Sequence, residues 1–283
     1  MTGMTAGIIT GYDGSEGSDE ALRWAAREAW ARGTALTICL TWPAADLRLL
    51  GDWGVHHRAR HLGGEILARG VWLAGAVPDL TDVRTLLAEG SPAQVLCEHS
   101  SAAEMVVLGS RGYGGLAGSR LGSVSWQVAC QGQGRIVVVR GQWRAVNQAP
   151  GPVVAGIDGS PDSQDALTFA FEEAALRDVP LVAVCALMDE PGRLGGARRM
   201  EENFDRLMTS REKEHPEITV LRHVTFGTPR SALLTATAEA QMLVVGARGL
   251  GGLAGMSLGS VAGALVHHSP CPVAVAHLAA RQP

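Results

Sequence analysis

The chain has 283 residues, of which 46% are hydrophobic and 18% charged, and a formal net charge of −4. At about 150 residues per domain this length predicts two domains, and the acidic balance argues against a nucleic-acid partner, which usually requires a basic face. No apolar run reaches the roughly 18 residues of a membrane-spanning helix, and the N-terminal sequence lacks the basic start and apolar stretch of a signal peptide. We therefore expect a cytoplasmic protein without a membrane partner.

The first half of the chain alternates short apolar stretches with segments of helical spacing. Ser18 is placed to cap the first helix and Gly33 to end it, while Ser91 and Pro92 fit the start of a later helix. This alternation predicts an α/β fold, with a parallel sheet covered by helices on both faces. In chain order, we expect strands over residues 7–12, 35–41, 83–88, 105–109 and 135–139, and helices over 18–32, 55–76, 91–100 and 122–130.

The second half of the chain repeats the first. Asp13-Gly14-Ser15 recurs as Asp158-Gly159-Ser160 at an offset of 145 residues, and a glycine-rich stretch recurs at an offset of 137. Two long copies indicate two similar domains rather than a solenoid. We place these domains at residues 1–144 and 145–283, with a polar linker over 141–152. Strands of the second domain are expected over residues 153–157, 181–186, 219–224, 242–246 and 272–276.

Each copy has its glycine-rich stretch directly after the fourth strand, reading GSRGYGGLAGSRLGS over residues 109–123 and GARGLGGLAGMSLGS over 246–260. Both stretches have the spacing Gly-x2-Gly-x9-Gly-Ser and lead into a helix. A helix N-terminus suits a phosphate because it has unpaired N–H groups and a partial positive charge. A tight turn followed by a linker is the structural alternative, but the repeated spacing in one strand-to-helix context favours a phosphate site.

Other nucleotide motifs do not fit the chain. It has no GxxxxGK[ST] sequence, and the dinucleotide fingerprint would follow the first strand rather than the fourth. Asp13 and Asp158 follow the first strands, at the sheet edge where ligands bind in such folds. Because a carboxylate repels a phosphate, we expect these residues to meet ribose hydroxyls or a metal carried by the phosphates.

Three motifs occur in the same order in both copies: Asp-Gly-Ser after the first strand, Gly-x-Pro before the third helix, and the glycine-rich stretch after the fourth strand. Together they resemble the universal stress protein family, as a tandem of two family domains that covers nearly the whole chain. The resemblance implies two Rossmann-like (adenine nucleotide alpha hydrolase-like) domains, each a five-stranded parallel sheet in the order 3-2-1-4-5. Members with the glycine motif bind ATP, so it also implies one ATP, with or without Mg²⁺, per domain.

The resemblance further assigns roles to single residues. The two aspartates would contact ribose, backbone groups of Thr41 and Ala186 would bond to adenine, Leu108 and Val245 would pack near the base, and the glycine-rich stretches would hold the phosphates. In the first domain the implied binding residues are Asp13, Gly14, Thr41, Leu108, Gly109, Arg111, Gly112, Gly122, Ser123, Val124 and Ser125. In the second domain they are Asp158, Gly159, Ala186, Val245, Gly246, Arg248, Gly249, Gly259, Ser260 and Val261.

The two copies differ near the glycine-rich stretch. Ser125 corresponds to Ala262 and Arg120 to Ser257, so the second copy lacks one hydroxyl donor and one cation. We therefore expect the first domain to bind a triphosphate more tightly. A matching arginine is kept in both copies and either contacts phosphate or is a solvated loop charge: Arg111 and Arg248.

Neither a metal site nor a disulfide framework is expected. The cysteines number five, which is odd, and no two form a CxxC pair, so we interpret them as buried apolar residues. His57 and His61 are spaced i, i+4, but no third ligand accompanies them, and we expect both to face solvent. Trp24 and Trp30 on the first helix are interpreted as core residues.

These features favour a regulatory, ATP-binding stress-response protein without assigned catalytic residues. The alternatives are a slow ATPase, a nucleotidyl transferase of related fold, and a partner-binding protein whose nucleotide sites are vestigial. The sequence GYDGSEG stands where related transferases have an HxGH signature, which argues against transfer chemistry. Activity beyond weak ATP hydrolysis is not expected, because no general base paired with a nucleophile is evident.

Assembly is predicted from the final strands. Single-domain members of the family usually pair through these strands. Residues 135–139 and 272–276 are both strongly apolar, and an exposed sheet edge of this kind invites association. We therefore predict that the two strands pair antiparallel within one chain, so that any homodimer of whole chains would use a different surface.

Overall fold

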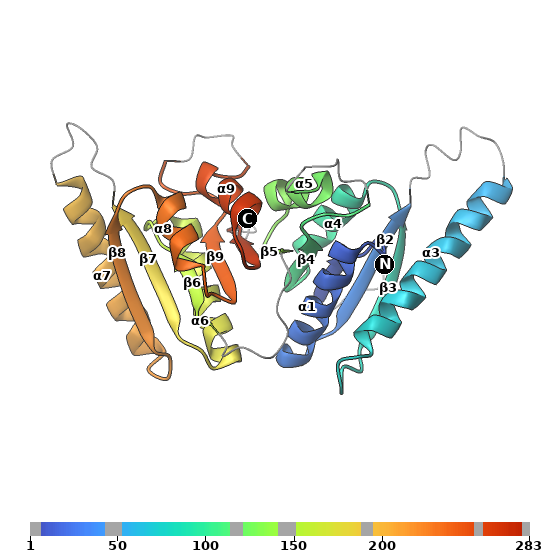
Figure 1. Cartoon of the computed structure of the whole chain (residues 1–283), viewed down its shortest axis with the longest axis horizontal. Coiled ribbons are helices and arrows are strands. Elements are labelled where there is room, and N and C mark those ends of the chain that lie inside the picture. Colours follow the sequence, from blue (N-terminus) through green and yellow to red (C-terminus); the bar gives the residue numbers. More distant parts are fainter. Residues whose placement is uncertain are drawn as a thin grey trace. The chain divides into compact units, whose positions relative to one another are not determined.

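A computed structural model of the chain describes residues 7–42, 53–113, 121–140, 151–187, 195–251 and 257–278 (Figure 1). The chain divides into two units, Met1–Val139 and Arg140–Pro283. The domain boundary predicted between residues 144 and 145 lies outside the described residues. Across the part of the chain that is described, no helix is both long and apolar enough to cross a membrane.

Within its described residues, the first unit has a five-stranded sheet in the order β3-β2-β1-β4-β5. All four pairs of neighbouring strands are parallel, which gives the predicted order 3-2-1-4-5. The strands are β1 (Ile8–Gly11), β2 (Leu36–Trp42), β3 (Val83–Glu89), β4 (Met105–Gly109) and β5 (Arg135–Val139). The helices are α1 (Glu16–Arg32), α3 (Trp53–Ala74), α4 (Pro92–Ser100) and α5 (Ser123–Gln131).

The described part of the second unit repeats this arrangement. Its strands are parallel in the order β8-β7-β6-β9-β10, again 3-2-1-4-5. The predicted α/β fold with two repeats is therefore confirmed. The strands are β6 (Val153–Gly156), β7 (Leu181–Leu187), β8 (Val220–Phe226), β9 (Met242–Gly246) and β10 (Val273–Ala276). The helices are α6 (Pro161–Arg177), α7 (Gly196–Glu214), α8 (Pro229–Ala236) and α9 (Ser260–His268).

The first helix begins earlier than the sequence predicts. Ser15, not Ser18, is the N-cap of α1: its side chain accepts a hydrogen bond from the Ser18 backbone N–H, and the Ser18 hydroxyl donates back to the Ser15 carbonyl at 2.9 Å. Either serine can cap a helix. With Ser15 as the N-cap, both serine side chains form hydrogen bonds to the backbone. The predicted end at Gly33 is confirmed, since Gly33 is a left-handed C-cap with φ 62°.

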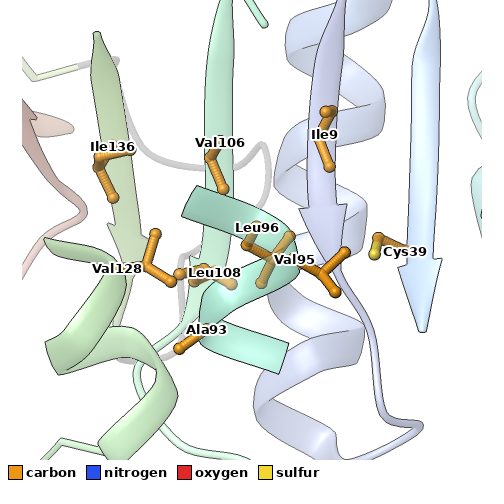
Figure 2. Close-up of a cluster of buried hydrophobic side chains, with 9 residues drawn as sticks. All are labelled: Ile9, Cys39, Ala93, Val95, Leu96, Val106, Leu108, Val128 and Ile136. Carbon is orange, nitrogen blue, oxygen red and sulfur yellow. The ribbon is translucent and has the colours of Figure 1, made fainter. Parts of the chain in front are cut away.

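Side chains of the strands in the first unit point alternately to the two faces of the sheet, and helices cover both faces. On one face, residues of four strands pack with α4 and α5 in a buried cluster of Ile9, Cys39, Ala93, Val95, Leu96, Val106, Leu108, Val128 and Ile136 (Figure 2). On the other face, α3 packs against β2, where Gly63 and Gly70 bring the helix close to Leu40 and Ile38. The sheet is therefore buried on both sides, as its apolar strands predict.

The sequence interpretation of single side chains is partly confirmed. All five cysteines are free, and three are buried, while Cys97 and Cys130 are partly exposed. Trp24 is a core residue, but the prediction for Trp30 is wrong, because its side chain is 53% exposed off the buried stripe of α1. His57 and His61 face solvent, as expected.

Candidate functional site

Two loops of the first unit come together at the carboxyl ends of its strands. The loop after β1 contains Asp13, and residues 109–122, here called the first glycine loop, follow β4. Because β1 and β4 are neighbours in the sheet, both loops leave it side by side, at the crevice where α/β folds bind ligands. The second unit has a matching second glycine loop, residues 246–259; residues 114–120 and 252–256 of these loops lie outside the described part.

A cavity of about 150 Å³ opens between these loops and the α4/α5 face. Cys39, Leu96 and Leu108 from the core cluster of Figure 2 form part of its wall. The cavity brings together all but one of the residues predicted for the first domain: Asp13, Thr41, Leu108, Gly109, Arg111, Gly112, Gly122, Ser123, Val124 and Ser125. Sequence reasoning missed the other lining residues, which are Gly11, Tyr12, Ser18, Cys39, Leu40, Pro92 and Leu96.

Most of these missed residues have a signal in the sequence. Gly11, Cys39 and Leu40 lie within three residues of the ends of β1 and β2, where side chains and backbone must border any ligand at the carboxyl edge. Pro92 belongs to the repeated Gly-x-Pro motif. Gly14, which was predicted, does not line the cavity; its carbonyl accepts hydrogen bonds from the Arg69 guanidinium at 2.8 Å and the Tyr113 hydroxyl at 3.2 Å.

The Asp13 carboxylate joins the two loops. One oxygen accepts the Ser15 N–H at 3.0 Å, and the other accepts the Tyr113 N–H of the first glycine loop at 3.0 Å. Burial alone would raise the pKa of this carboxyl, but the hydrogen bonds from Ser15, Tyr113 and Ser18 outweigh burial and lower the pKa below its ordinary value. Asp13 is therefore anionic at neutral pH and positions the glycine loop.

The repeated spacing of the glycines has two different physical causes. A Cβ on Gly109 would lie within 3.0 Å of the Gly17 backbone, and a Cβ on Gly112 would lie within 3.0 Å of the Asp13 carboxylate. These two glycines allow the loops to pack against each other. A Cβ on Gly122 would instead have its nearest neighbour, the Ser110 carbonyl oxygen, at 3.6 Å. Of the three glycines, only Gly122 therefore has open space beside it, and a side chain at this position would fill that space.

Helix α5 starts at this open glycine. Gly122 is its N-cap and supplies no side-chain hydrogen bond, so the first-turn N–H groups are available to a ligand, and Ser123 is exposed beside them. The expectation that Ser125 is a further free donor needs correction. Its buried hydroxyl donates to the Gly109 carbonyl at 2.6 Å and so ties α5 to the end of β4.

A polar network that the sequence does not reveal supports the loop after β1. The buried Tyr12 hydroxyl donates to Asp19 at 2.8 Å, and Asp19 also pairs with Arg69 of α3. Burial, followed by the hydrogen bond to Asp19, raises the pKa of Tyr12 above its ordinary value, so the hydroxyl remains protonated. Because Arg69 also donates to the Gly14 carbonyl, the network joins α1, α3 and the loop.

The second unit repeats the joining carboxylate. Asp158 accepts the Ser160 N–H at 2.9 Å and the Leu250 N–H of the second glycine loop at 2.9 Å. Gly246 packs against the first turn of α6 and Gly249 against Asp158, whereas a Cβ on Gly259 would have its nearest neighbour, the Ala247 carbonyl oxygen, at 3.2 Å. The framework of the site is therefore duplicated.

The remaining predicted residues of the second unit lie at the same carboxyl edge. Gly159 has a left-handed φ of 84°, as has Gly14 in the first unit. Ala186 is partly buried near the end of β7, Val245 is buried on β9, Ser260 is exposed at the first position of α9, and Val261 follows it partly buried. Arg120, on which one expected difference between the copies rests, lies outside the described residues.

A cavity of about 290 Å³ in the second unit has a different location. Asp158 and Gly159 are the only predicted residues that line it. The other lining residues are Ile157, Cys185, Leu250 and a series from α7, which are Gly196, Arg199, Met200, Asn203, Phe204 and Leu207. In the first unit, Tyr12 and Tyr113 stand where Ile157 and Leu250 stand here, and they bond to the network around Asp19 and Gly14.

Comparison with known proteins agrees with this fold and its two repeats. The model of the universal stress protein family matches residues 4–140 and 151–277. A universal stress protein of Mycobacterium tuberculosis is 37% identical over 290 residues, and the alignment covers 95% of this chain and 96% of the relative. A universal stress protein of Mycolicibacterium smegmatis is 34% identical over 283 residues, with the same two coverages. The fold resembles a crystal structure of a universal stress protein from Archaeoglobus fulgidus, with a TM-score of 0.72, 21% identity and coverage of 96% and 97%.

Proposed function

Because the chain belongs to the universal stress protein family, we propose that it is a regulatory stress-response protein that binds ATP at the carboxyl edge of each sheet. One observation supports this most directly. The first-unit cavity gathers ten of the eleven residues predicted for nucleotide binding, from four separate segments of the chain, beside a helix N-terminus that has no side-chain cap.

The chemistry of the cavity matches the parts of ATP. Leu96, Leu108 and the partly buried Thr41 offer apolar surface and backbone groups to adenine. At about 150 Å³ the cavity is smaller than the roughly 300 Å³ of a complete small-molecule pocket. We therefore place the base inside it and the ribose and phosphates on the open surface of the first glycine loop, toward Ser123 and the α5 N-terminus.

Charge is distributed in agreement with this placement. The exposed Arg111 lies in the loop and supplies a cation for phosphate, while the charge of the anionic Asp13 is already engaged by the backbone N–H groups of Ser15 and Tyr113. The Asp13 carboxylate already accepts two backbone N–H groups, so a hydrogen bond from a ribose hydroxyl would be its third. When bound, Mg²⁺ neutralises part of the phosphate charge, which lowers the repulsion from Asp13.

The lining residues favour binding over hydrolysis. Among the residues that line this cavity, the only carboxylate is Asp13, which two backbone N–H groups hold in place. The Cys39 thiol is a poor nucleophile, because burial raises its pKa to about 12. Neither group is poised as a general base near neutral pH.

The proposal is tested on the purified full-length protein. After denaturation, the supernatant is analysed for adenine nucleotide by absorbance and mass spectrometry, and the protein freed of nucleotide is melted with ATP and Mg²⁺. Ligand at about 100 times its Kd adds roughly 2.7 kcal/mol of stability per site, so the expected result is a clear rise in Tm with ATP and little with GTP. No shift with any adenine nucleotide would refute the proposal.

A further inference from the structure

The arginine of the second glycine loop is held by a carboxylate. The Asp162 side chain, on the first turn of α6, accepts the Arg248 backbone N–H at 3.0 Å and pairs with the Arg248 Nε at 3.3 Å. Asp162 is only 5% exposed, whereas the Arg248 side chain is 52% exposed. The charge of Arg248 is therefore compensated before any ligand arrives.

The first unit differs at the equivalent position. Gly17 stands where the second unit has Asp162, and a Cβ on Gly17 would lie within 3.0 Å of the Arg111 carbonyl oxygen. The first-turn carboxylate Asp19 pairs with Arg69 of α3 rather than with the loop. Among the described residues, the exposed Arg111 side chain forms no ion pair. One glycine loop thus has an available cation, and the other does not.

From this difference we infer that the two sites select adenine nucleotides by phosphate number: the first glycine loop prefers the triphosphate, and Asp162 makes the second glycine loop prefer a nucleoside monophosphate. The inference rests on the proposed function, because it assumes that both loops bind adenine nucleotides. It names Asp162 as the residue that determines specificity.

The physical reason is the cost of freeing Arg248. In the described structure Asp162 engages only the Nε of the Arg248 guanidinium, so a triphosphate can reach the Nη groups, but a guanidinium that stays paired with Asp162 brings little net positive charge to the phosphates. Drawing the guanidinium fully onto the phosphates would leave a buried carboxylate without its cation. The carboxylate would then also repel the phosphates, and this repulsion grows with each phosphate charge. A monophosphate can use the N-terminus of α9 and the exposed Ser260 without disturbing the pair. The penalty therefore falls mainly on the longer phosphate chain.

The sites can be measured separately in the full-length chain. Gly122→Val fills the open space at the first glycine loop and leaves only the second site, whereas Gly259→Val leaves only the first site. Each variant is titrated calorimetrically with ATP and with AMP at fixed Mg²⁺ and salt. Melting without nucleotide shows that the fold is kept. We expect ATP to bind about tenfold tighter than AMP at the first site, and no tighter than AMP at the second.

The decisive variant is Asp162→Asn in the Gly122→Val background. Asparagine keeps the size of the side chain and one acceptor for the Arg248 N–H, but it releases the guanidinium charge. We expect the ATP affinity of the second site to rise about tenfold, the size of one charge-assisted hydrogen bond, and the AMP affinity to change less than about threefold. Arg248→Ala in the same background leaves the Asp162 carboxylate without its cation, so we expect the ATP affinity of the second site to fall rather than to rise.

A matched control removes the same charge at the other edge of the sheet. Glu217→Gln, in the exposed segment before β8, should change neither affinity. If Asp162→Asn raises ATP and AMP affinity equally, or changes neither while both nucleotides bind, the inference is wrong and the proposed function stands. If folded protein binds no adenine nucleotide at either site, the proposed function itself fails, and the inference fails with it.

Discussion

The Asp13 carboxylate accepts the backbone N–H of Tyr113 at 3.0 Å, although the two residues are 100 positions apart in the chain. Asp158 and Leu250 repeat the contact in the second unit at 2.9 Å. In both units a carboxylate after the first strand thus fixes the start of the glycine loop after the fourth strand. The aspartate of the repeated Asp-Gly-Ser motif has a structural role that exists before any ligand binds.

Asp13→Ala should loosen the first glycine loop. The substitution leaves the N–H groups of Ser15 and Tyr113 without their acceptor, so we expect a loss of stability of about 1–3 kcal/mol. Hydrogen exchange of the Tyr113 amide should become faster. Asp82→Ala is the control, because the Asp82 side chain is exposed and, in the described structure, bonds only to Arg84. Unchanged exchange at Tyr113 would show that the contact does not position the loop.

The same contact predicts a dependence on acid pH. The pKa of Asp13 is lowered in the folded state, so its contribution to stability is fully present above the ordinary value of 3.8 and is lost as pH falls through the folded value. The free-energy difference between the wild type and Asp13→Asn should therefore shrink below about pH 4. Denaturant unfolding at several pH values measures it. A difference that stays constant down to pH 2 would contradict the assignment.

Gly17→Ala should destabilise the protein by about 1–3 kcal/mol. The new Cβ would press on the carbonyl of Arg111, which is backbone and cannot move without displacing the first glycine loop. Gly64 in α3 provides the matched control, because a Cβ there meets nothing within 4 Å. Gly64→Ala should stabilise the helix by roughly 0.5–1 kcal/mol. Thermal unfolding distinguishes the two; equal effects would mean that the loop does not pack on α1 as described.

Alkaline pH should reduce stability through Cys39. Burial raises the pKa of its thiol from 9.0 to about 12, so the stability it contributes is present below pH 9 and is lost as pH rises toward 12. Near pH 10.5 this loss is on the order of 2 kcal/mol. The free energy of unfolding of Cys39→Ala should fall less steeply with pH between about 9 and 11 than that of the wild type. The slopes are compared, because the substitution also changes the absolute stability. Identical slopes would show that Cys39 ionises in the folded protein.

Much of the fold could be predicted because the strands of a buried parallel sheet are continuous apolar runs. Met105–Gly109 and Arg135–Val139 have the bounds that the sequence predicts. The repeated spacing of Gly109, Gly112 and Gly122 also located the candidate site. The order strand, loop, helix was sufficient to locate the site, because the carboxyl ends of parallel strands lie at one edge of the sheet and bring their loops together there.

The contacts between loops could not be predicted, because they depend on tertiary neighbours. Ser125 reads as a free hydroxyl, but the end of β4 provides the carbonyl that it bonds to. Asp162 reads as an ordinary first-turn carboxylate, and only the fold brings Arg248 to it across 86 residues. The predicted pairing of residues 135–139 with 272–276 stays a prediction, to be tested by engineered crosslinks between the two strands.

The most direct test of the account is a calorimetric titration of the full-length chain with ATP and Mg²⁺, repeated on Gly122→Val, Gly259→Val and the double variant. Both glycines are helix N-caps with φ of −74° and −70°, which any residue can adopt. A side chain at Gly122 would make ordinary contacts, whereas at Gly259 the Ala247 carbonyl oxygen, 3.2 Å from the new Cβ, must shift by a few tenths of an ångström. We predict two unequal binding events in the wild type, loss of the tighter one in Gly122→Val, and no binding in the double variant. ATP binding that persists unchanged in the double variant, or no binding heat in the folded wild type, would contradict nucleotide binding at the glycine loops.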